Sequence, residues 1–156
     1  MADRRPERLE ALRRKLAVSS LDALLVSSLP NIRYLTGFSG SSALLLVSAG
    51  GALLISDFRY KTQAAQEVGD LARVAINGGS AWELLFTLLP KLPGVTAAGF
   101  ESHIITARDS ERLADPSRPW RFLATADIVE GLRAVKAPEE VEAVRAAGAV
   151  ATAALE

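Results

Sequence analysis

The sequence predicts an α/β domain built on a mixed β-sheet with helices on both faces, followed by a C-terminal linker helix. Short apolar runs typical of buried strands alternate with segments of helical periodicity over most of the chain. Two consecutive apolar runs, residues 43–47 and 52–55, break this alternation, because only the turn residues 48–51 separate them. A hairpin within an alternating pattern indicates a mixed sheet, not a purely parallel one.

The first predicted helix covers residues 8–16, because Leu9, Leu12 and Leu16 recur three and four residues apart and form one apolar stripe. Length, periodicity and flanking turn residues predict the other elements. In chain order these are a strand at 23–26, a turn or short helix at 30–35, a loop at 37–42, the hairpin strands, a helix at 60–68, a strand at 72–76, a helix at 81–89, a strand at 96–100, a helix at 107–113 and a strand at 121–124.

Turn and cap residues support these boundaries. The paired glycines Gly50 and Gly51 suit the positive φ that a tight hairpin turn requires. Ser80 and Thr106 are expected to cap the helices that they precede, and Pro90 ends the first of these helices.

The composition excludes several classes of function. The 156 residues carry a formal net charge of zero, so no global field attracts nucleic acid or an anionic membrane. There is no cysteine, which excludes a disulfide scaffold, a thiolate metal site and a cysteine nucleophile. No apolar run reaches about 18 residues, and the polar start does not resemble a signal peptide. We therefore expect a cytoplasmic protein with neither nucleic acid nor membrane as a partner. Glu7 and Glu10 interrupt the basic N-terminal run, which predicts a solvated helix face.

The sequence offers no complete catalytic motif. His103 is the sole histidine, and its proximity in sequence to Ser102 carries little weight, because a triad is defined by spatial geometry. We interpret it as a loop or surface residue. Residues 37–41 resemble a nucleophile elbow and a Walker loop but satisfy neither pattern, and residues 77–80 fail the dinucleotide pattern. Neither catalytic residues nor a set of metal ligands are predicted within this chain.

The last segment predicts a connection to a further domain. Residues 129–140 are interpreted as a connector, and an Ala-rich helix begins at Pro138. Such a helix is marginal alone and needs a partner surface for its small apolar face. We expect the chain to be the front part of a longer protein, with one domain at 1–127 and a linker with the first helix of an absent catalytic domain at 128–156.

Three segments, taken in order, carry a family resemblance. They are residues 31–47; residues 54–60 with Gln63 and Ala64; and residues 129–136 with Glu139, Glu140, Val144, Arg145, Ala147 and Ala151. Together they resemble the N-terminal domain of the creatinase, prolidase and Xaa-Pro aminopeptidase family, whose catalytic domain has the pita-bread fold. Residues 99–101 also fit the family pattern. The resemblance implies the ribonuclease H-like fold of that N-terminal domain.

The resemblance also implies that the parent protein is a metal-dependent hydrolase. In this family two Asp, two Glu and one His of the catalytic domain hold two divalent ions, commonly manganese, cobalt or zinc. A bridging water attacks the bond preceding a proline. Those ligands would all follow Glu156, and His103 does not match the family's ligand histidine. The chain alone is therefore expected to bind no cofactor and to be inactive.

A non-catalytic role follows from the same resemblance. The family's N-terminal domain serves homodimer assembly and restricts access of short proline-containing peptides to the active site. The matching candidates for a substrate rim or subunit contact are Asn31, Phe38, Ser39, Gly40 and Ser41. Two of them have competing interpretations, since Asn31 also suits a cap on a short turn, and Phe38 suits core packing beneath the hairpin. Arg59 and Tyr60 match a family turn in which Asp57 satisfies backbone donors.

Two other functions remain open at this stage. The same fold without peptidase chemistry serves as a protein-binding module in a histone-chaperone subunit, although the neutral charge argues against histone binding. A creatinase-like amidinohydrolase, acting on a guanidino compound, is the other. Within the peptidase interpretation, an aminopeptidase and a dipeptidase are equally compatible with the residues.

Overall fold

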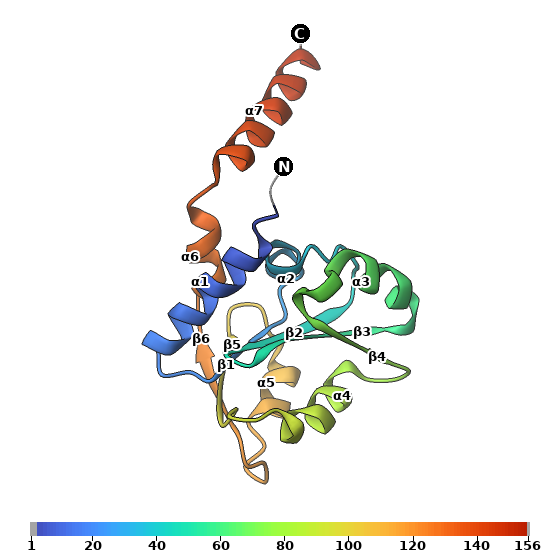
Figure 1. The fold of residues 1–156 in the computed structure, drawn as a ribbon, viewed down its shortest axis with the longest axis vertical. Helices are drawn as coiled ribbons and strands as arrows, with labels where there is room; N and C mark the ends of the chain where they lie inside the picture. Colours follow the sequence, from blue (N-terminus) through green and yellow to red (C-terminus); the bar gives the residue numbers. More distant parts are fainter. Residues whose placement is uncertain (1–2, 156) are drawn as a thin grey trace.

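A six-stranded mixed sheet forms the centre of the molecule (Figure 1). The computed structural model describes residues 3–155; Met1, Ala2 and Glu156, which the expected domain boundaries include, lie outside the described part. The strands are β1 (Ala23–Val26), β2 (Ala43–Ser48), β3 (Gly51–Asp57), β4 (Arg73–Asn77), β5 (Ala97–Glu101) and β6 (Arg121–Thr125), in the spatial order β4-β3-β2-β1-β5-β6. Strand β2 pairs antiparallel with β1 and β3, and the other three pairings are parallel. The predicted mixed sheet is confirmed.

Helices cover both faces of this sheet, as predicted. The helices are α1 (Arg5–Val18), α2 (Leu29–Thr36), α3 (Lys61–Val68), α4 (Ala81–Leu88), α5 (Ala107–Leu113), α6 (Ile128–Ala134) and α7 (Pro138–Ala153), with 3₁₀ turns η1 (Phe58–Tyr60), η2 (Gly69–Leu71) and η3 (Leu89–Lys91). Buried residues of α1, α2, α3 and α6 join one hydrophobic core, and those of α4 and α5 join a second core.

The alternation of side chains along a strand separates these two cores. In β1, Leu24 and Val26 belong to the first core, whereas Ala23 and Leu25 belong to the second. The predicted leucine stripe of α1 lies in the first core and is no more than 2% exposed. Burying one such leucine contributes roughly 1.5–3 kcal/mol. Apolar packing is therefore what fixes α1 on the sheet.

The hairpin and the caps agree with the sequence with two exceptions. Ser48 pairs with Gly51, and Gly51 adopts a φ of 143°; the prediction of positive φ for Gly50 as well is wrong. Thr106 accepts a hydrogen bond from the backbone N–H of Asp109 at 3.2 Å, as a cap should. Ser80 occupies the cap position of α4, but its side chain makes no capping bond within the described residues.

The segment interpreted as a connector begins with a helix. Residues 128–134 form α6, and Val129 is buried in the first core at 1% exposure. The expected boundary at residue 127 therefore separates α6 from the core into which it packs. Helix α7 extends away from the sheet and the other helices (Figure 1). Its larger apolar side chains are exposed, Val144 at 64% and Val150 at 73%. None of the helices in residues 3–155 combines the length and apolar character needed to cross a bilayer.

Candidate functional site

Four of the five predicted rim residues line one groove. Phe38, Ser39, Gly40 and Ser41 border an open groove of about 880 Å³. The other lining residues come from four helices: Arg8 of α1; Leu29, Pro30, Arg33 and Tyr34 of α2; Arg133 of α6; and Glu140 of α7. The fold thus brings the Gly-Ser loop together with the end of α6 and the start of α7.

The loop in this groove is held by aromatic packing beneath it. Phe38 is 1% exposed and meets the Tyr60 ring edge-on, with ring centroids 5.6 Å apart and an interplanar angle of 87°. The interpretation of Phe38 as a core residue is confirmed. A Cβ at Gly40 would overlap the Phe38 ring and lie 2.9 Å from Tyr60 Cδ1. Only glycine allows this backbone to approach both rings without displacing them.

Hydrogen bonds fix the two loop serines. Ser39 donates to Glu67 from its backbone N–H at 2.8 Å and from its hydroxyl at 2.7 Å. Burial opposes ionisation of Glu67, but these bonds bring its pKa below the usual value. The Ser41 hydroxyl lies 2.7 Å from the Tyr60 hydroxyl. Both serines are exposed but already engaged, so they form a rigid polar rim.

Asn31 is not a cap, and that competing interpretation is wrong. Ser28 occupies the N-cap position of α2, and Asn31 lies one turn in with an exposed fraction of 0%. Its Nδ2 donates to Glu101 Oε1 and to Glu130 Oε1, both at 2.6 Å, and its Oδ1 accepts from Arg133 Nη1 at 2.8 Å. Asn31 therefore links the end of β5 to α6.

Glu101 completes this buried network. The second oxygen of Glu101 accepts the backbone N–H groups of Ser27 at 2.7 Å and Ser28 at 2.8 Å, and the residue is 3% exposed. A buried carboxylate is tolerated when several donors satisfy it, which is the case here. No local sequence pattern indicates that Glu101, Glu130 and Arg133 meet, because they lie 70 to 102 residues from Asn31 along the chain.

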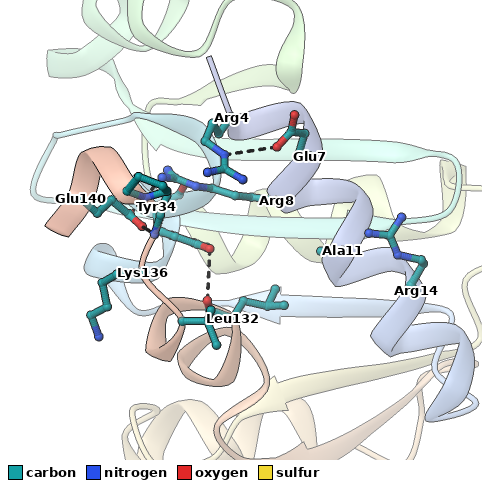
Figure 2. A pocket seen from close by; sticks show the side chains of 12 residues that line it. Arg4, Glu7, Arg8, Ala11, Arg14, Tyr34, Leu132, Lys136 and Glu140 are labelled. Atoms are coloured by element: carbon teal, nitrogen blue, oxygen red, sulfur yellow. Dashed lines mark hydrogen bonds and ion pairs between the residues drawn. The ribbon is translucent and has the colours of Figure 1, made fainter. Parts of the chain in front are cut away.

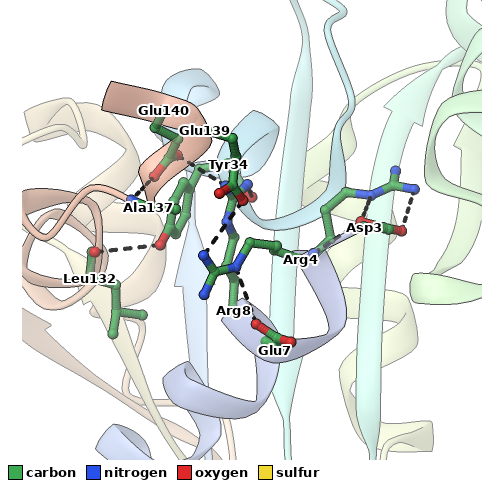
Figure 3. A network of polar contacts seen from close by, with 10 residues as sticks. Asp3, Arg4, Glu7, Arg8, Tyr34, Leu132, Ala137, Glu139 and Glu140 are labelled. Carbon is green, nitrogen blue, oxygen red and sulfur yellow. Dashed lines mark hydrogen bonds and ion pairs between the residues drawn. The ribbon is translucent and has the colours of Figure 1, made fainter. Parts of the chain in front are cut away.

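A second polar contact joins the start of α1 to the start of α7 (Figures 2 and 3). Arg8 donates to the Tyr34 carbonyl at 2.9 Å and to Glu140 Oε1 at 3.0 Å, and its guanidinium lies 4.2 Å from the centre of the Tyr34 ring. Arg4 lies 3.5 Å from Glu139. We call these four charged residues the α1–α7 clasp. It borders a pocket of about 390 Å³ between α1 and the start of α7. Arg4 and Arg8 are therefore partly exposed but paired, which the predicted solvated face does not anticipate.

His103 occupies the surface position that the sequence predicts. The Ser102 hydroxyl donates to the Thr125 carbonyl at 2.9 Å, so it does not form a dyad with His103. Instead His103 Nε2 lies 3.3 Å from Glu130 Oε1. Ligand atoms of His103, Asp127 and Glu130 all lie within 4.8 Å of one another. These three residues, which can bind a metal, are not predicted as a group from the sequence.

Comparison with known proteins identifies the fold. Residues 8–135 match the model of the Creatinase/Prolidase N-terminal domain family. The chain belongs to this family. The uncharacterized peptidase YqhT of Bacillus subtilis is 31% identical over 144 residues, which are 92% of this chain and 40% of that protein.

Two solved structures share the arrangement of elements. An Xaa-Pro dipeptidase from Bacillus anthracis superimposes with a TM-score of 0.81 at 25% identity, over 88% of this chain and 38% of that chain. The N-terminal domain of the cytoplasmic peptidase PepQ from Mycobacterium tuberculosis superimposes with a TM-score of 0.73 at 39% identity, over 81% of this chain and 98% of that chain. This chain thus spans about two fifths of the B. subtilis and B. anthracis relatives and nearly all of the isolated M. tuberculosis domain.

Proposed function

We propose that this chain is the non-catalytic N-terminal domain of a cytoplasmic, metal-dependent Xaa-Pro peptidase. The observation that carries the proposal is the family match over residues 8–135, together with a dipeptidase whose structure this chain covers only in part. The cytoplasmic assignment rests on the M. tuberculosis relative, which is described as cytoplasmic.

Metal chemistry in this proposal belongs to the catalytic domain. Two manganese, cobalt or zinc ions held by that domain would supply Lewis-acid activation of water and of the peptide carbonyl before a proline. Helix α7 supports a catalytic domain as the covalent partner, because its valines are exposed and an isolated Ala-rich helix is marginal. The clasp sets the direction in which α7 leaves the sheet.

The rim formed by the loop 38–41 is proposed to contact a second subunit and to limit access to the active site. The loop suits this role because the rings of Phe38 and Tyr60 and the carboxylate of Glu67 hold it in one conformation. A rigid rim selects short peptides by excluding longer ones, which is specificity through unfavourable contacts. A homodimer is the assembly in which one subunit's rim borders its neighbour's site.

The test compares this chain with the same chain extended by the segment that follows it in the gene. We expect the extended protein to hydrolyse Ala-Pro peptides with added manganese, cobalt or zinc, and the 156-residue chain to release no product. Peptides of increasing length then separate an aminopeptidase from a dipeptidase. Turnover of creatine instead of Ala-Pro would replace the proposal with an amidinohydrolase. Metal-dependent turnover by the short chain would refute its non-catalytic role.

The rim needs a separate measurement. Ser39→Arg and Ser41→Arg add bulk at exposed positions of the loop, and Thr87→Arg on the exposed surface of α4 is the matched control. We expect the two loop variants of the extended protein to shift the dimer toward monomer in light scattering, or to change the longest peptide that is cleaved. Loop variants with the parent's mass and length preference would remove the rim from the proposal.

A further inference from the structure

Three side chains with metal-binding groups meet outside the groove, at the carboxyl ends of two strands. His103 follows β5, Asp127 lies between β6 and α6, and Glu130 is in the first turn of α6. One nitrogen or oxygen atom from each residue lies within 4.8 Å of the other two. We propose that His103, Asp127 and Glu130 bind one divalent transition-metal ion of the zinc type. This inference goes beyond the proposed function and does not depend on it.

The closest pair of these atoms already has the spacing of two ligands on one ion. His103 Nε2 and Glu130 Oε1 are 3.3 Å apart. A tetrahedral zinc ion with bonds of about 2.0–2.1 Å to nitrogen and oxygen places its ligands about 3.3–3.4 Å from one another. An ion can therefore bind between these two groups with little movement of either side chain.

The Glu130 carboxylate has an oxygen that lacks a partner. Glu130 Oε2 is buried and makes no hydrogen bond with any of the residues 3–155. Leaving a buried acceptor unsatisfied is costly, and a cation bound to this carboxylate would reduce that cost. The other oxygen, Oε1, accepts from Asn31 Nδ2 at 2.6 Å and lies 3.3 Å from His103 Nε2. The carboxylate therefore offers an ion Oε1 on the side of His103, and Oε2 as an acceptor that the described residues leave open.

Buried residues behind the site hold this carboxylate in place. Asn31 is 0% exposed, and Glu101 and Arg133 fix both ends of its amide. Fixed hydrogen-bond partners behind a metal ligand orient it and commonly change metal affinity by about 10–100-fold. The arrangement has the two layers expected of a built site: exposed His103 and Asp127 in front, and the buried amide of Asn31 behind.

The donor set selects the class of ion. An imidazole nitrogen with two carboxylates suits zinc and its neighbours, whereas magnesium and calcium prefer oxygen ligands alone. Exposure of His103 and Asp127 leaves room for water at the remaining coordination position. Lys15 borders the same pocket as Asp127. A bound ion would tie the loop after β5 to α6, and so would fix the helix that leads into α7.

A single-histidine chain allows a direct test. His103 is the sole histidine among the 156 residues, so protein purified without a histidine tag gives one imidazole signal in a nitrogen-15 NMR spectrum. We expect one equivalent of zinc chloride to shift the Nε2 resonance, and magnesium chloride to leave it unchanged. Asp127→Asn alters an exposed residue without disturbing the buried network, and should weaken zinc binding by at least about tenfold.

Two further variants make the outcome decisive. His103→Gln should abolish stoichiometric zinc binding in calorimetry, and Glu142→Gln, at an exposed acid on α7, should bind zinc as the parent does. Urea unfolding of each variant verifies that the fold is intact. The proposal is overturned if excess zinc leaves the imidazole signal in place. It is equally overturned if Asp127→Asn binds zinc as tightly as the parent, because Asp127 would then not be a ligand of the ion.

Discussion

The buried network around Asn31 and the α1–α7 clasp use similar residues under opposite conditions. Asn31 and Glu101 are 0% and 3% exposed, whereas the side chains of the Arg8–Glu140 pair are 21% and 32% exposed. Burial makes every unmet polar group costly, so each atom of Asn31 has a partner. Water screens the clasp, and exposed ion pairs contribute about 0–1 kcal/mol. Similar distances in the two regions therefore correspond to very different energies.

The largest expected effect comes from Asn31→Asp, which replaces the central amide with a third carboxylate. The variant would lose both donors to Glu101 and Glu130 and add a buried negative charge. We expect the free energy of unfolding to fall by about 3–5 kcal/mol, the cost typical of a broken buried pair. Urea denaturation at neutral pH measures this loss.

Gln63→Glu is the matched control for that substitution. It also converts an amide to a carboxylate beside another carboxylate, because Gln63 Nε2 donates to Glu67 at 3.1 Å. Since Gln63 is only partly buried, the change should cost about 1 kcal/mol or less. Equal losses for the two variants would contradict the conclusion that burial sets the energy of the network.

Gly40→Ala tests the packing of the loop 38–41 against the rings of Phe38 and Tyr60, where burial acts through close contact and not through hydrogen bonds. The new methyl group would overlap Phe38 and press on Tyr60, and overpacking of a tight core typically costs about 1–3 kcal/mol. Gly78→Ala is the control, since a Cβ at Gly78 meets nothing within 4 Å. Thermal unfolding of both variants measures the difference in stability between them. A stability of Gly40→Ala equal to that of Gly78→Ala would show that the loop yields to accommodate the methyl group.

These two regions also mark how far the sequence predicts the structure. Local sequence patterns predict the strands and the hairpin, because apolar periodicity depends on near neighbours. They also predict the burial of Phe38, because aromatic side chains are usually buried. The competing interpretation of Asn31 as a cap is wrong because its three partners come from two distant segments, the end of β5 and α6. The contact between Arg8 and Glu140 is absent from the sequence-based prediction because the two residues lie 132 positions apart. Helix α6 lies largely within residues 129–140, which the sequence pattern assigns to a connector.

The clasp should contribute little to global stability and more to local order. Arg8→Ala removes the bonds to Tyr34 and Glu140 and should lower the free energy of unfolding by about 1 kcal/mol. Because α7 has few other contacts, amide exchange in its first turn should accelerate more than exchange in α1. Arg14→Ala, at a side chain that is 70% exposed, is the control. High salt should mimic Arg8→Ala if the contact is electrostatic. If Arg8→Ala lowered the free energy of unfolding by several kcal/mol, the clasp would contribute to stability as strongly as the buried network does.

The smallest expected effect concerns the Asp57–Arg59 ion pair, which lies at the surface outside both regions and shows the limit of screening. The hydrogen bond from Arg59 lowers the pKa of Asp57 to about 2, against an unfolded value of about 3.9. Because the unfolded chain binds the proton more tightly, the pair stabilises the fold above about pH 4, and this contribution is lost as the pH falls toward 2. Carboxyl NMR titration should show Arg59→Ala raising the Asp57 midpoint toward 3.9, whereas Arg73→Ala leaves it near 2. An unchanged midpoint in Arg59→Ala would show that the backbone of the turn, and not the Arg59 side chain, lowers the pKa of Asp57. Fixed backbone geometry, rather than a neighbouring charge, would then keep this partly exposed acid ionised.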